Sequence, residues 1–553
     1  MADLGGSKIY HKNVPPKARQ LPAERFDVLL ILGVFEWGPI NTATTCIDYS
    51  DFYRTYGRYL AGYEGPIQVK QYFDGGGRLV VANRVAHLTD YLSGTTLATA
   101  VKATKNFSAG GVAPYNGITL QVDGLYYGTR GNDLRIVIQN ATRDPAGTTE
   151  YFDLLVYLSG ETVPEEWYRN LSMDTTNDRY VEDVINTESS RSAWIAVTDL
   201  TAVGTATQRR PVNIALTALL GGNDGLTALA ATDYTGNATY RTGMHAFTSV
   251  EDGDILICPD RAAVTADQNS LTTYCEVTRG GKVMFIVDPP LAADRTAAVA
   301  HATALTASEF RSAVYWPRVK VANPDKTIYG KDDNITICPS GSIAGRMALN
   351  AQQQPEGQFS QPGNSIYGLL TGVTSLEGAI GTRHEVLEPT VRDYVTPHLI
   401  NPIVEGNRPS DGNWGVWLND VQGGKYANAN FRTVGEIHGV SYLRKQFERL
   451  LEQHRTQGNT VDRRRDIAEV FEAELMKWTE RGAFATRDVS TAFYVNTDPD
   501  GEGLNNALVQ AQQTMNVLVA IATADPARFM YLMFTKDKRA VDSYIQQKLA
   551  QGK

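Results

Sequence analysis

Cysteine and histidine are both scarce in this chain. Its 553 residues include four cysteines and eight histidines. A structural zinc site needs closely spaced thiolates or imidazoles, whereas the four cysteines are far apart and form no C-x-x-C pair: Cys46, Cys258, Cys275 and Cys338. The sequence therefore predicts buried, reduced thiols and no metal site.

Long apolar runs are also missing. No stretch approaches the ~20 apolar residues that a membrane-spanning helix requires. Residues 1–6 lack the basic start and the apolar run of a signal peptide. We therefore expect no membrane insertion and no export through a cleaved signal.

The chain is short of charge, and of positive charge in particular. Charged residues make up 20% of it, and the formal net charge is -9, whereas globular proteins usually contain roughly 25% charged residues. A nucleic-acid binder needs a basic surface that displaces counterions from phosphates. We therefore expect no direct nucleic-acid partner. The low charge content favours surface that is buried against protein partners.

The chain is too long for one hydrophobic core, so two to four domains are expected. Residues 1–24 are polar and carry three prolines, and such a segment cannot form a core of its own, which indicates an extended arm. Changes in apolar patterning divide the remainder into a first α/β part at 25–94, a β-rich insertion at 95–210, a middle α/β domain at 211–376, a C-terminal part at 377–535 and an extension at 536–553.

Apolar patterning predicts the elements inside these parts. Continuous apolar runs are typical of strands in a buried parallel sheet, and they lie at 26–33, 78–85, 254–258, 282–287, 313–316 and 335–338. Antiparallel strands are expected at 118–122, 134–138 and 152–158, and further strands at 491–496, 516–521 and 528–534. Helical patterns lie at 48–60, 66–73 and 291–309, and amphipathic faces occupy 443–451 and 467–478.

Motifs that would carry catalysis fail in detail. The stretch Ser340–Gly345 resembles a nucleophile elbow, but G-x-S-x-G would need glycine at 340, so a loop opening a helix is expected. Residues 496–501 resemble the start of a calcium loop, but the twelfth position is Ala507 where a bidentate glutamate is required, so a hairpin tip is expected. His384 and Glu385 lack the second histidine of H-E-x-x-H. The sequence therefore predicts no catalytic residue and no cofactor.

A run of three arginines is the most basic feature of the chain. Arg463, Arg464 and Arg465 lie between Asp462 and Asp466. Such a run either docks an acidic partner or forms the solvated start of a helix. Both interpretations stay open.

Three groups of motifs, in order along residues 26–535, together resemble the tail sheath family of contractile bacteriophages. The first contains Gly38-Pro39-Ile40-Asn41, Tyr72-Phe73-Asp74-Gly75-Gly76-Gly77 and Val80-Val81-Ala82-Asn83-Arg84-Val85. The second contains Leu220-Gly221-Gly222-Asn223-Asp224-Gly225, Asp254–Pro259, Asp288-Pro289-Pro290 and Pro339–Gly345. The third contains Leu399–Ile403, Gly415-Val416-Trp417, Asn430-Phe431-Arg432, Trp478–Ala483, Ala492–Val495 and Pro526–Phe529.

The resemblance implies a structural protein that is not an enzyme. Family sheaths form stacked six-fold rings around a tail tube, and they contract to drive the tube through the host envelope. The implied partners are copies of the chain itself, the tail tube protein, and the baseplate and tail terminator proteins. The implied location is the phage tail of the virion, after assembly in the host cytoplasm. The implied fold is an inner α/β domain built from the N- and C-terminal parts, with the β-rich insertion and a second α/β domain between them.

Terminal arms in this family add strands to neighbouring subunits. Carried over to this chain, the resemblance implies arm residues at both ends: Ile9, Tyr10, Val14, Phe529, Tyr531 and Met533. It also allows Arg463, Arg464 and Arg465 to form a basic patch that faces the tube. The usual P-G-V-Y-V-x-E arm is replaced here by the sequence of residues 9–14, and the chain continues past its last predicted strand.

Two other interpretations stay open. The chain is also compatible with the sheath of a phage-tail-like bacteriocin or of a secretion machine. The alternation of strands and helices over 211–365 is also compatible with an α/β hydrolase-like enzyme, but fold analogy alone does not support an activity.

Overall fold

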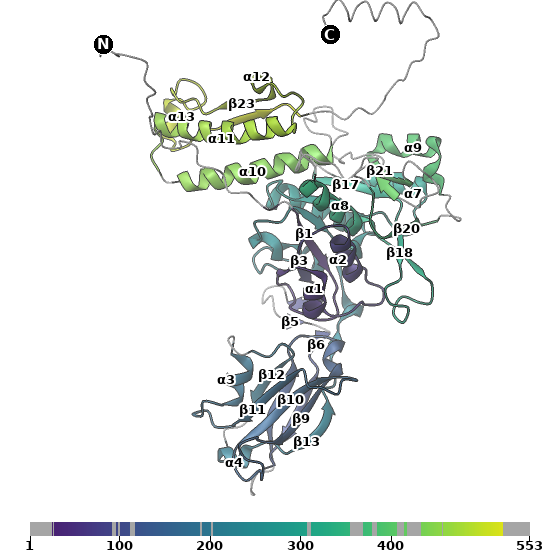
Figure 1. The fold of residues 1–553 in the computed structure, drawn as a ribbon, viewed down its shortest axis with the longest axis vertical. Helices are drawn as coiled ribbons and strands as arrows, with labels where there is room; N and C mark the ends of the chain where they lie inside the picture. Colours follow the sequence, from purple (N-terminus) through teal and green to yellow (C-terminus); the bar gives the residue numbers. More distant parts are fainter. Residues whose placement is uncertain are drawn as a thin grey trace, which may run out of the picture. The chain divides into compact units, whose positions relative to one another are not determined.

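The computed structural model describes residues 25–523, except for 26, 91–95, 98–99, 111–116, 188–190, 201–202, 307–310, 354–368, 379–383, 406–413, 417–432 and 456. The chain divides into two compact units (Figure 1). The larger unit holds the described residues from 25 to 455, and the smaller holds residues 457–523.

An eight-stranded sheet is the centre of the larger unit. We call this sheet, with the helices that cover it, the α/β body. Its order is β2-β3-β1-β15-β16-β17-β21-β22, in which the six inner strands are parallel and both edge strands are antiparallel. The strands are β2 (Thr44–Cys46), β3 (Leu79–Arg84), β1 (Val28–Gly33), β15 (Ile255–Ile257), β16 (Met284–Val287), β17 (Ser312–Trp316), β21 (Ile400–Glu405) and β22 (Trp414–Val416). Strands β1, β15, β16 and β17 are buried at every residue, as expected for continuous apolar runs covered on both faces.

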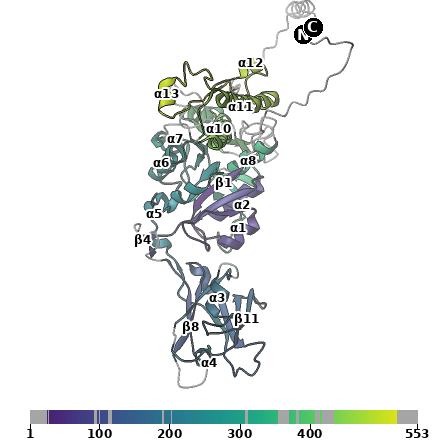
Figure 2. The same ribbon diagram turned by 90° about the vertical axis from the view of Figure 1, so that its left-hand side faces the viewer.

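Helices cover both faces of this sheet. Figure 2 shows one set on one side of β1 and a second set on the other side. The first set is α1 (Tyr49–Tyr56), α2 (Gly65–Asp74) and α8 (Ser340–Gln353), and the second includes α5 (Ala231–Thr235), α6 (Thr265–Thr273) and α7 (Arg295–Ala304). Helix α9 (Pro389–Val395) packs against α7 and β21. The predicted helices at 48–60 and 291–309 are confirmed in shorter form, and the one at 66–73 is confirmed and is one residue longer at each end.

The predicted separation of residues 25–94 from residues 211–376 is wrong. Strand β1 pairs directly with β15, Leu29 opposite Ile255, so both segments build one sheet and one core. The predicted strand at 335–338 is confirmed as β19 (Asn334–Ile337), but it lies outside the parallel sheet. It pairs antiparallel with β18 (Val319–Ala322), which also pairs with β20 (Val373–Leu376). Polar and apolar residues alternate in β19, which suits a half-exposed antiparallel strand.

The predicted β-rich insertion has its own core. One sheet has the order β11-β10-β9-β13 and another the order β12-β8-β7. The strands are β11 (Glu166–Leu171), β10 (Phe152–Leu158), β9 (Leu134–Asn140), β13 (Ile214–Ala218), β12 (Ile195–Asp199), β8 (Ile118–Gly124) and β7 (Thr104–Ser108), with helices α3 (Val181–Asn186) and α4 (Ala206–Arg209). Inward-facing residues such as Ile136, Ile138 and Leu154 form a buried cluster separate from that of the body. We call residues 100–224 the β-rich module.

The module is joined to the body by two short strands that pair with each other. Strand β6 (Ala100–Val101) runs antiparallel to β14 (Asn223–Asp224). Near this joint, the buried Arg84 side chain at the end of β3 donates to Tyr127 O at 2.8 Å and contacts Asp224 Oδ1 at 3.4 Å. Another short pair, β4 (Leu88–Asp90) with β5 (Thr96–Leu97), lies between β3 and β6 in the sequence.

Two long amphipathic helices follow, as predicted, and they belong to different units. Helix α10 (Val434–His454) lies in the larger unit and begins with a capping box of Thr433 and Glu436. The smaller unit contains α11 (Val461–Arg481), α12 (Val489–Ala492), α13 (Ala507–Ala511) and the antiparallel pair β23 (Phe493–Asn496) and β24 (Leu518–Ile521). Of the part expected at 377–535, residues 384–455 belong to the same unit as the N-terminal part 25–94, whereas residues 457–523 form the smaller unit. The predicted strand at 528–534 lies outside the described residues.

Candidate functional site

The carboxyl ends of β1 and β15 meet where the strand order reverses. In open α/β sheets this switch point opens a crevice where ligands bind. Here a side chain of the protein itself lies at that position. Asp260, which follows β15, accepts a hydrogen bond from Val34 N at 2.8 Å. Burial raises the pKa of Asp260 to about 7, against the hydrogen bond from Val34 N, which lowers it.

The neighbouring strand ends carry a connected network of charged groups. Arg318, after β17, pairs with Glu64 Oε1 at 2.8 Å, and Glu64 Oε2 accepts from Cys338 N at 2.6 Å. Asp288, after β16, accepts from Ser340 N at the start of α8 at 3.1 Å. Burial raises the pKa of Asp288 to about 7, while Ser340 and Arg318 lower it. The network ties together segments far apart in the sequence, and its members occupy the edge where a ligand would lie.

The stretch that resembles a nucleophile elbow is a helix contact. Helix α8 begins at Ser340, as expected for a loop opening a helix, and the Ser342 hydroxyl is buried and contacts Gln71 Oε1 at 3.3 Å. A Cβ at Gly341 would lie 2.5 Å from Gln68 O, and one at Gly345 would lie 2.6 Å from Tyr72 O. The two glycines therefore let α8 pack directly on the backbone of α2, and Ser342 is not exposed as a nucleophile must be.

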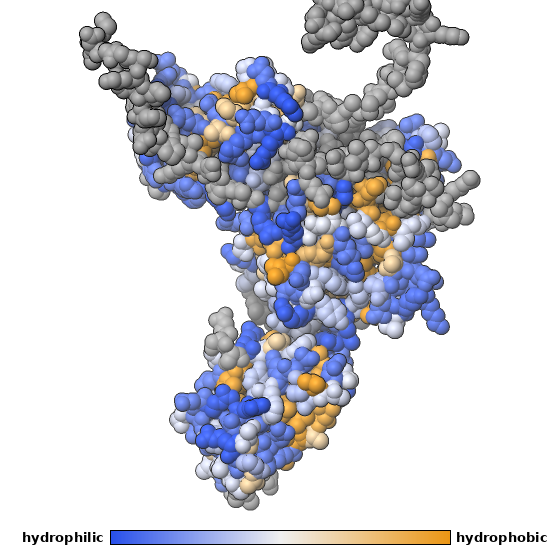
Figure 3. All heavy atoms as spheres, viewed as in Figure 1, coloured by the Kyte–Doolittle hydropathy of each residue, from blue (hydrophilic) through white to orange (hydrophobic). Residues whose placement is uncertain are grey.

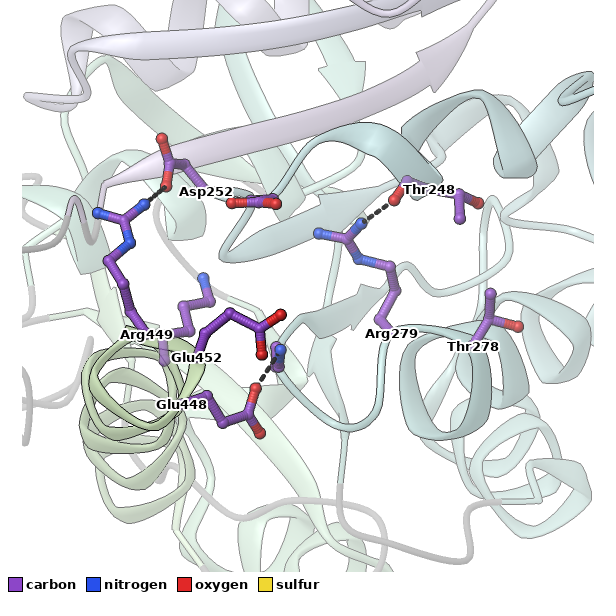
Figure 4. A pocket seen from close by; sticks show the side chains of 10 residues that line it. Thr248, Asp252, Thr278, Arg279, Glu448, Arg449 and Glu452 are labelled. Carbon is purple, nitrogen blue, oxygen red and sulfur yellow. Dashed lines mark hydrogen bonds and ion pairs between the residues drawn. The ribbon is translucent and has the colours of Figure 1, made fainter. Parts of the chain in front are cut away.

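A charged cleft of about 390 Å³ lies beside α10 (Figure 4). It is lined by Thr248, Glu251, Asp252, Thr278, Arg279, Lys282, Lys445, Glu448, Arg449 and Glu452. Acidic and basic side chains from opposite walls pair across it: Lys282 contacts Glu448, and Arg449 lies 4.0 Å from Asp252. Arg279 donates to Phe247 O at 2.7 Å. Since the charges balance, the cleft favours neither an anion nor a cation, and it joins α10 to the body.

A buried ion pair lies beside this cleft. Lys445 of α10 donates to Gly253 O at 2.7 Å and pairs with Asp254, which also accepts from Val28 N at 3.0 Å. Burial raises the pKa of Asp254 to about 6, and Lys445 opposes this shift. Burial, together with the charge of Lys445, lowers the pKa of His438 to about 3. The pair therefore anchors α10 to β1 and to the segment that leads into β15.

The three predicted arginines lie in the first turns of α11. Arg464 is buried, and it donates to Asn459 Oδ1 and to Pro499 O, each at 2.7 Å. Arg465 is exposed and lies 3.4 Å from Asp500, and Arg463 is half-buried beside Gln457. The structure therefore gives Arg464 a role inside the smaller unit, and only Arg463 and Arg465 present their side chains to solvent. The tube-facing patch stays a prediction.

The predicted arm residues lie outside the described residues, at both ends of the chain: Ile9, Tyr10, Val14, Phe529, Tyr531 and Met533. The structure does describe a strand that such an arm could extend. In the part described, β23 pairs only with β24, and its Tyr494 side chain is 57% exposed. The unpaired edge of β23 offers backbone donors and acceptors to an added strand.

The four cysteines agree with the sequence analysis. All four cysteines are free and buried, and burial raises the pKa of each thiol. Within the described residues there is no group of three or more potential metal ligands. None of the helices described there has the length and apolar character to cross a bilayer.

The carboxylates Glu64, Asp260 and Asp288 were missed in the sequence analysis, because nothing local marks residues that meet only in the fold.

Comparison with known proteins gives one consistent result. No protein-family model and no curated protein matches the sequence. Among solved structures, the chain is similar to a sheath tail protein from Listeria innocua (TM-score 0.57, 14% identity, 92% of this chain and 96% of that one). It is also similar to a sheath tail protein from Desulfitobacterium hafniense (0.53, 14%, 89% and 94%).

A third similar structure is the helical sheath of the anti-feeding prophage in its contracted state (0.53, 13% identity, 97% of this chain and 100% of that one). At these identities the likeness is one of fold. It extends over most of this chain and of each of the three structures. The chain therefore has the fold of tail sheath proteins, which confirms the resemblance predicted from its sequence.

Proposed function

We propose that this chain is a structural tail sheath subunit of a contractile phage. Copies of it assemble as stacked six-fold rings around a tail tube, above a baseplate and below a terminator protein, and contract to drive the tube through the host envelope. The observation that carries this proposal is the shared fold, which extends over 97% of this chain and all of a sheath in its contracted state. The protein is then assembled in the host cytoplasm and carried in the virion.

A sheath of a related injection machine is the second candidate. It is favoured by the likeness to the sheath of the anti-feeding prophage. Subunits of the two kinds of machine behave alike in isolation. Neighbouring genes separate them, since capsid and genome-packaging genes accompany a phage tail and are missing beside an injection machine.

The enzyme interpretation has little in its favour. At the switch point of the sheet, Asp260 and its neighbours occupy the place where a substrate would lie, and Ser342 is buried against α2. These polar groups hold strand ends and helix starts together. A role in stiffening a subunit that moves as a rigid body accounts for them without any reaction.

Electron microscopy of the purified chain across a concentration series tests the assembly proposal. We expect striated hollow tubes or stacked rings, alone or when the chain is co-expressed with its tail tube protein. Dispersed particles under both conditions would contradict the proposal. As a control for folding, the same samples should show one cooperative melting transition for each folded unit.

The arms give a sharper test. We propose that strands from the chain termini complete the sheet of β23 and β24 in neighbouring copies, since each added cross-strand pair stabilises the contact by about 0.2–1 kcal/mol. Deleting residues 1–20 should leave the melting temperature unchanged and abolish connected tubes. Intact tubes from the truncated chain would disprove the role of the N-terminal arm.

The exposed arginines of α11 give the test of the tube contact. We propose that Arg463 and Arg465 face an acidic surface of the tube. The variant Arg463→Glu/Arg465→Glu should lower the fraction of tubes that acquire a sheath, without lowering the melting temperature. Arg464→Glu is not a suitable variant, because Arg464 is buried. An unchanged sheathed fraction would rule the patch out.

A further inference from the structure

One end of the β-rich module carries three arginines that have no acidic partner. Arg143 lies between β9 and β10, Arg169 lies on the edge strand β11, and Arg179 lies just before α3. Among the described residues, none of the three pairs with a carboxylate, whereas Arg84 and Arg318 of the body do. Unpaired guanidinium groups gathered in one place are available to an anionic partner.

Two of the three guanidinium groups lie over aromatic rings at stacking distance. The Arg169 Cζ atom is 3.9 Å from the centre of the Trp167 ring, and the Arg143 Cζ atom is 4.1 Å from that of Tyr151. Stacking uses the face of a guanidinium and leaves the N–H donors along its edge free. It also fixes the orientation of the fork, so less rotational freedom is lost when an anion binds.

A chain of hydrogen bonds holds the three arginines near one β-bulge. Arg143 N donates to Asn170 Oδ1 at 2.9 Å, and Arg179 Nη2 donates to Arg169 O at 2.6 Å. Asn170 has a φ of 54°, where a non-glycine residue needs support. That support is Asp153, which is 1% exposed and accepts from Asn170 N at 2.7 Å. The position of the cluster is therefore set by a buried carboxylate.

The acidic groups around the cluster are engaged with neutral donors. Asp144 accepts from Thr149 N and Oγ1, Asp174 accepts from Thr176, and Glu150 accepts from Ser172 and Asn177. Trp167 Nε1 donates to Asp153 Oδ2 at 3.1 Å. The hydrophilic side of the module in Figure 3 lies over β11, and apolar residues gather on the side of β13. The arginines thus stand in a surface of hydroxyl, amide and carboxylate groups.

We propose that Arg143, Arg169 and Arg179 form a binding site for an anionic polysaccharide. Carboxylate, sulfate or phosphate groups of the polymer accept hydrogen bonds from the guanidinium edges. Sugar rings cover the part of Trp167 that remains exposed, which is 43% of that residue. This proposal goes beyond the sheath function and does not depend on it.

A sparsely charged polymer fits this surface better than a nucleic acid. Acidic residues outnumber basic ones within the module, so a strand with a charge at every nucleotide is repelled over most of its length. A polysaccharide places its charges further apart, and its hydroxyl groups find partners among the threonine and asparagine side chains of this surface.

The test uses the full chain with three probes, by calorimetry in 0.15 M salt. Hyaluronate fragments and unsulfated chondroitin fragments carry one carboxylate for every two sugars, and neutral dextran carries no charge. We expect binding to at least one of the two anionic probes and none to dextran. Arg143→Ala/Arg169→Ala should raise Kd at least tenfold. The matched control, Lys105→Ala/Arg135→Ala, removes the same charge from other strands of the module and should change Kd less than twofold.

Two further variants distinguish a specific arginine site from nonspecific electrostatic attraction. Arg169→Lys keeps the charge and loses the planar fork, so it should weaken binding by an intermediate factor. Asp178→Asn, on the exposed loop before Arg179, should leave binding almost unchanged. Melting temperatures of all variants check that the module stays folded.

Four results would overturn the proposal. They are an equal loss of affinity in the double variant and its matched control, dextran binding as strong as hyaluronate binding, tighter binding of single-stranded DNA than of either anionic glycan, and no binding of either anionic probe by the unaltered chain. None of these results bears on whether the chain assembles into tubes.

Discussion

The α/β body and the β-rich module both bury ion pairs, but the module also places arginines against aromatic rings on its surface. In the body, the side chains of the Lys445–Asp254 pair are only 7% and 3% exposed, and Arg318 and Glu64 pair at the strand ends. The module has a comparable buried pair, Arg209 with Asp199. In the module, Arg143 and Arg169 lie on the outside against aromatic rings. In the body, ion pairs join secondary-structure elements to one another. In the module, some charged side chains face solvent.

The two kinds of sheet explain this difference. A parallel sheet covered on both faces leaves polar residues no place except the strand ends, where they must pair with one another. An antiparallel sheet with one solvated face gives every second residue access to water. The two cores are separate except at Trp37 of the body, which packs on Tyr126 and Trp194 of the module, and how far the two regions are independent can be tested.

The largest expected effect comes from the core of the body. Phe285→Ala in β16, where Phe285 is 1% exposed, should lower the free energy of unfolding of the body by about 4 kcal/mol, because a large buried ring leaves a cavity. Hydrogen exchange should show this loss in β15 and β16 and none in β9 and β10. The matched variant Ile136→Ala should show the reverse. Equal losses in both regions from either variant would mean one shared core.

Next comes the ion pair at the strand ends. Arg318→Leu should lower the free energy of unfolding of the body by about 3 kcal/mol, because it leaves Glu64 and the buried Asp288 without their cation. The double variant Glu64→Gln/Arg318→Leu should recover part of the loss in urea denaturation. A double variant as unstable as the sum of the two single ones would show that the pair is not coupled.

Asp288 contributes to the pH dependence of the body together with Asp254 and Asp260. Its folded pKa of about 7 exceeds the unfolded value, so the folded state binds the proton more tightly, and this stabilisation is lost as the pH rises from about 4 through 7. Asp288→Asn has no proton to lose there. The free energy of unfolding of Asp288→Asn minus that of the unaltered chain should therefore rise between pH 5 and pH 8. Comparing the two chains cancels the contribution of the histidines. A constant difference across this range would contradict the assignment.

In the module, Asp153 is expected to have a smaller effect. Asp153→Asn should lower the free energy of unfolding of the module by about 2 kcal/mol, because Asn170 N, Trp167 Nε1 and Thr142 all donate to this buried carboxylate. It should also weaken glycan binding, since the bulge positions Arg169. Asp178→Asn is the exposed control and should change stability by less than about 0.5 kcal/mol. Thermal unfolding monitored by Trp fluorescence gives both values.

The smallest effect is expected at the charged cleft. Lys282 and Glu448 are 35% and 38% exposed, and exposed ion pairs contribute only about 0.2–1 kcal/mol. Lys282→Ala should therefore cost about 0.5 kcal/mol in low salt and almost nothing in 1 M salt. A salt-independent loss above about 2 kcal/mol would mean that the cleft is a tighter joint than its exposure suggests.

Local patterns in the sequence were enough to predict most elements of the fold. Runs such as Val28–Leu32 have one interpretation, because only a strand covered on both faces buries every residue. The placement of β19 was not predictable in this way, since four residues are too few to separate alternation from a continuous run. The division of the chain at residue 456 was also missed, because two similar amphipathic helices on either side of it gave no sign of belonging to different units.

The polar sites were hidden for a different reason. Asp288 and Arg318 follow two neighbouring strands and Glu64 precedes α2, so the three side chains meet only in the fold. Alternation along a strand is enough to place Arg169 and Trp167 on one face, but the register shift beside Asn170 is not visible in the sequence. The motif Ser340–Gly345 was visible in the sequence, but its meaning came from the distance between two helix backbones.

The paired strands β6 and β14 have a consequence for how such chains diversify. Adjacent strands lie about 5 Å apart, so the module enters and leaves the body at almost one point. A foreign domain whose termini lie equally close could take its place, provided that it also covers Trp37 and supplies a partner for the buried Arg84. At this joint the module can be exchanged for another domain, either by recombination between genomes or by protein engineering.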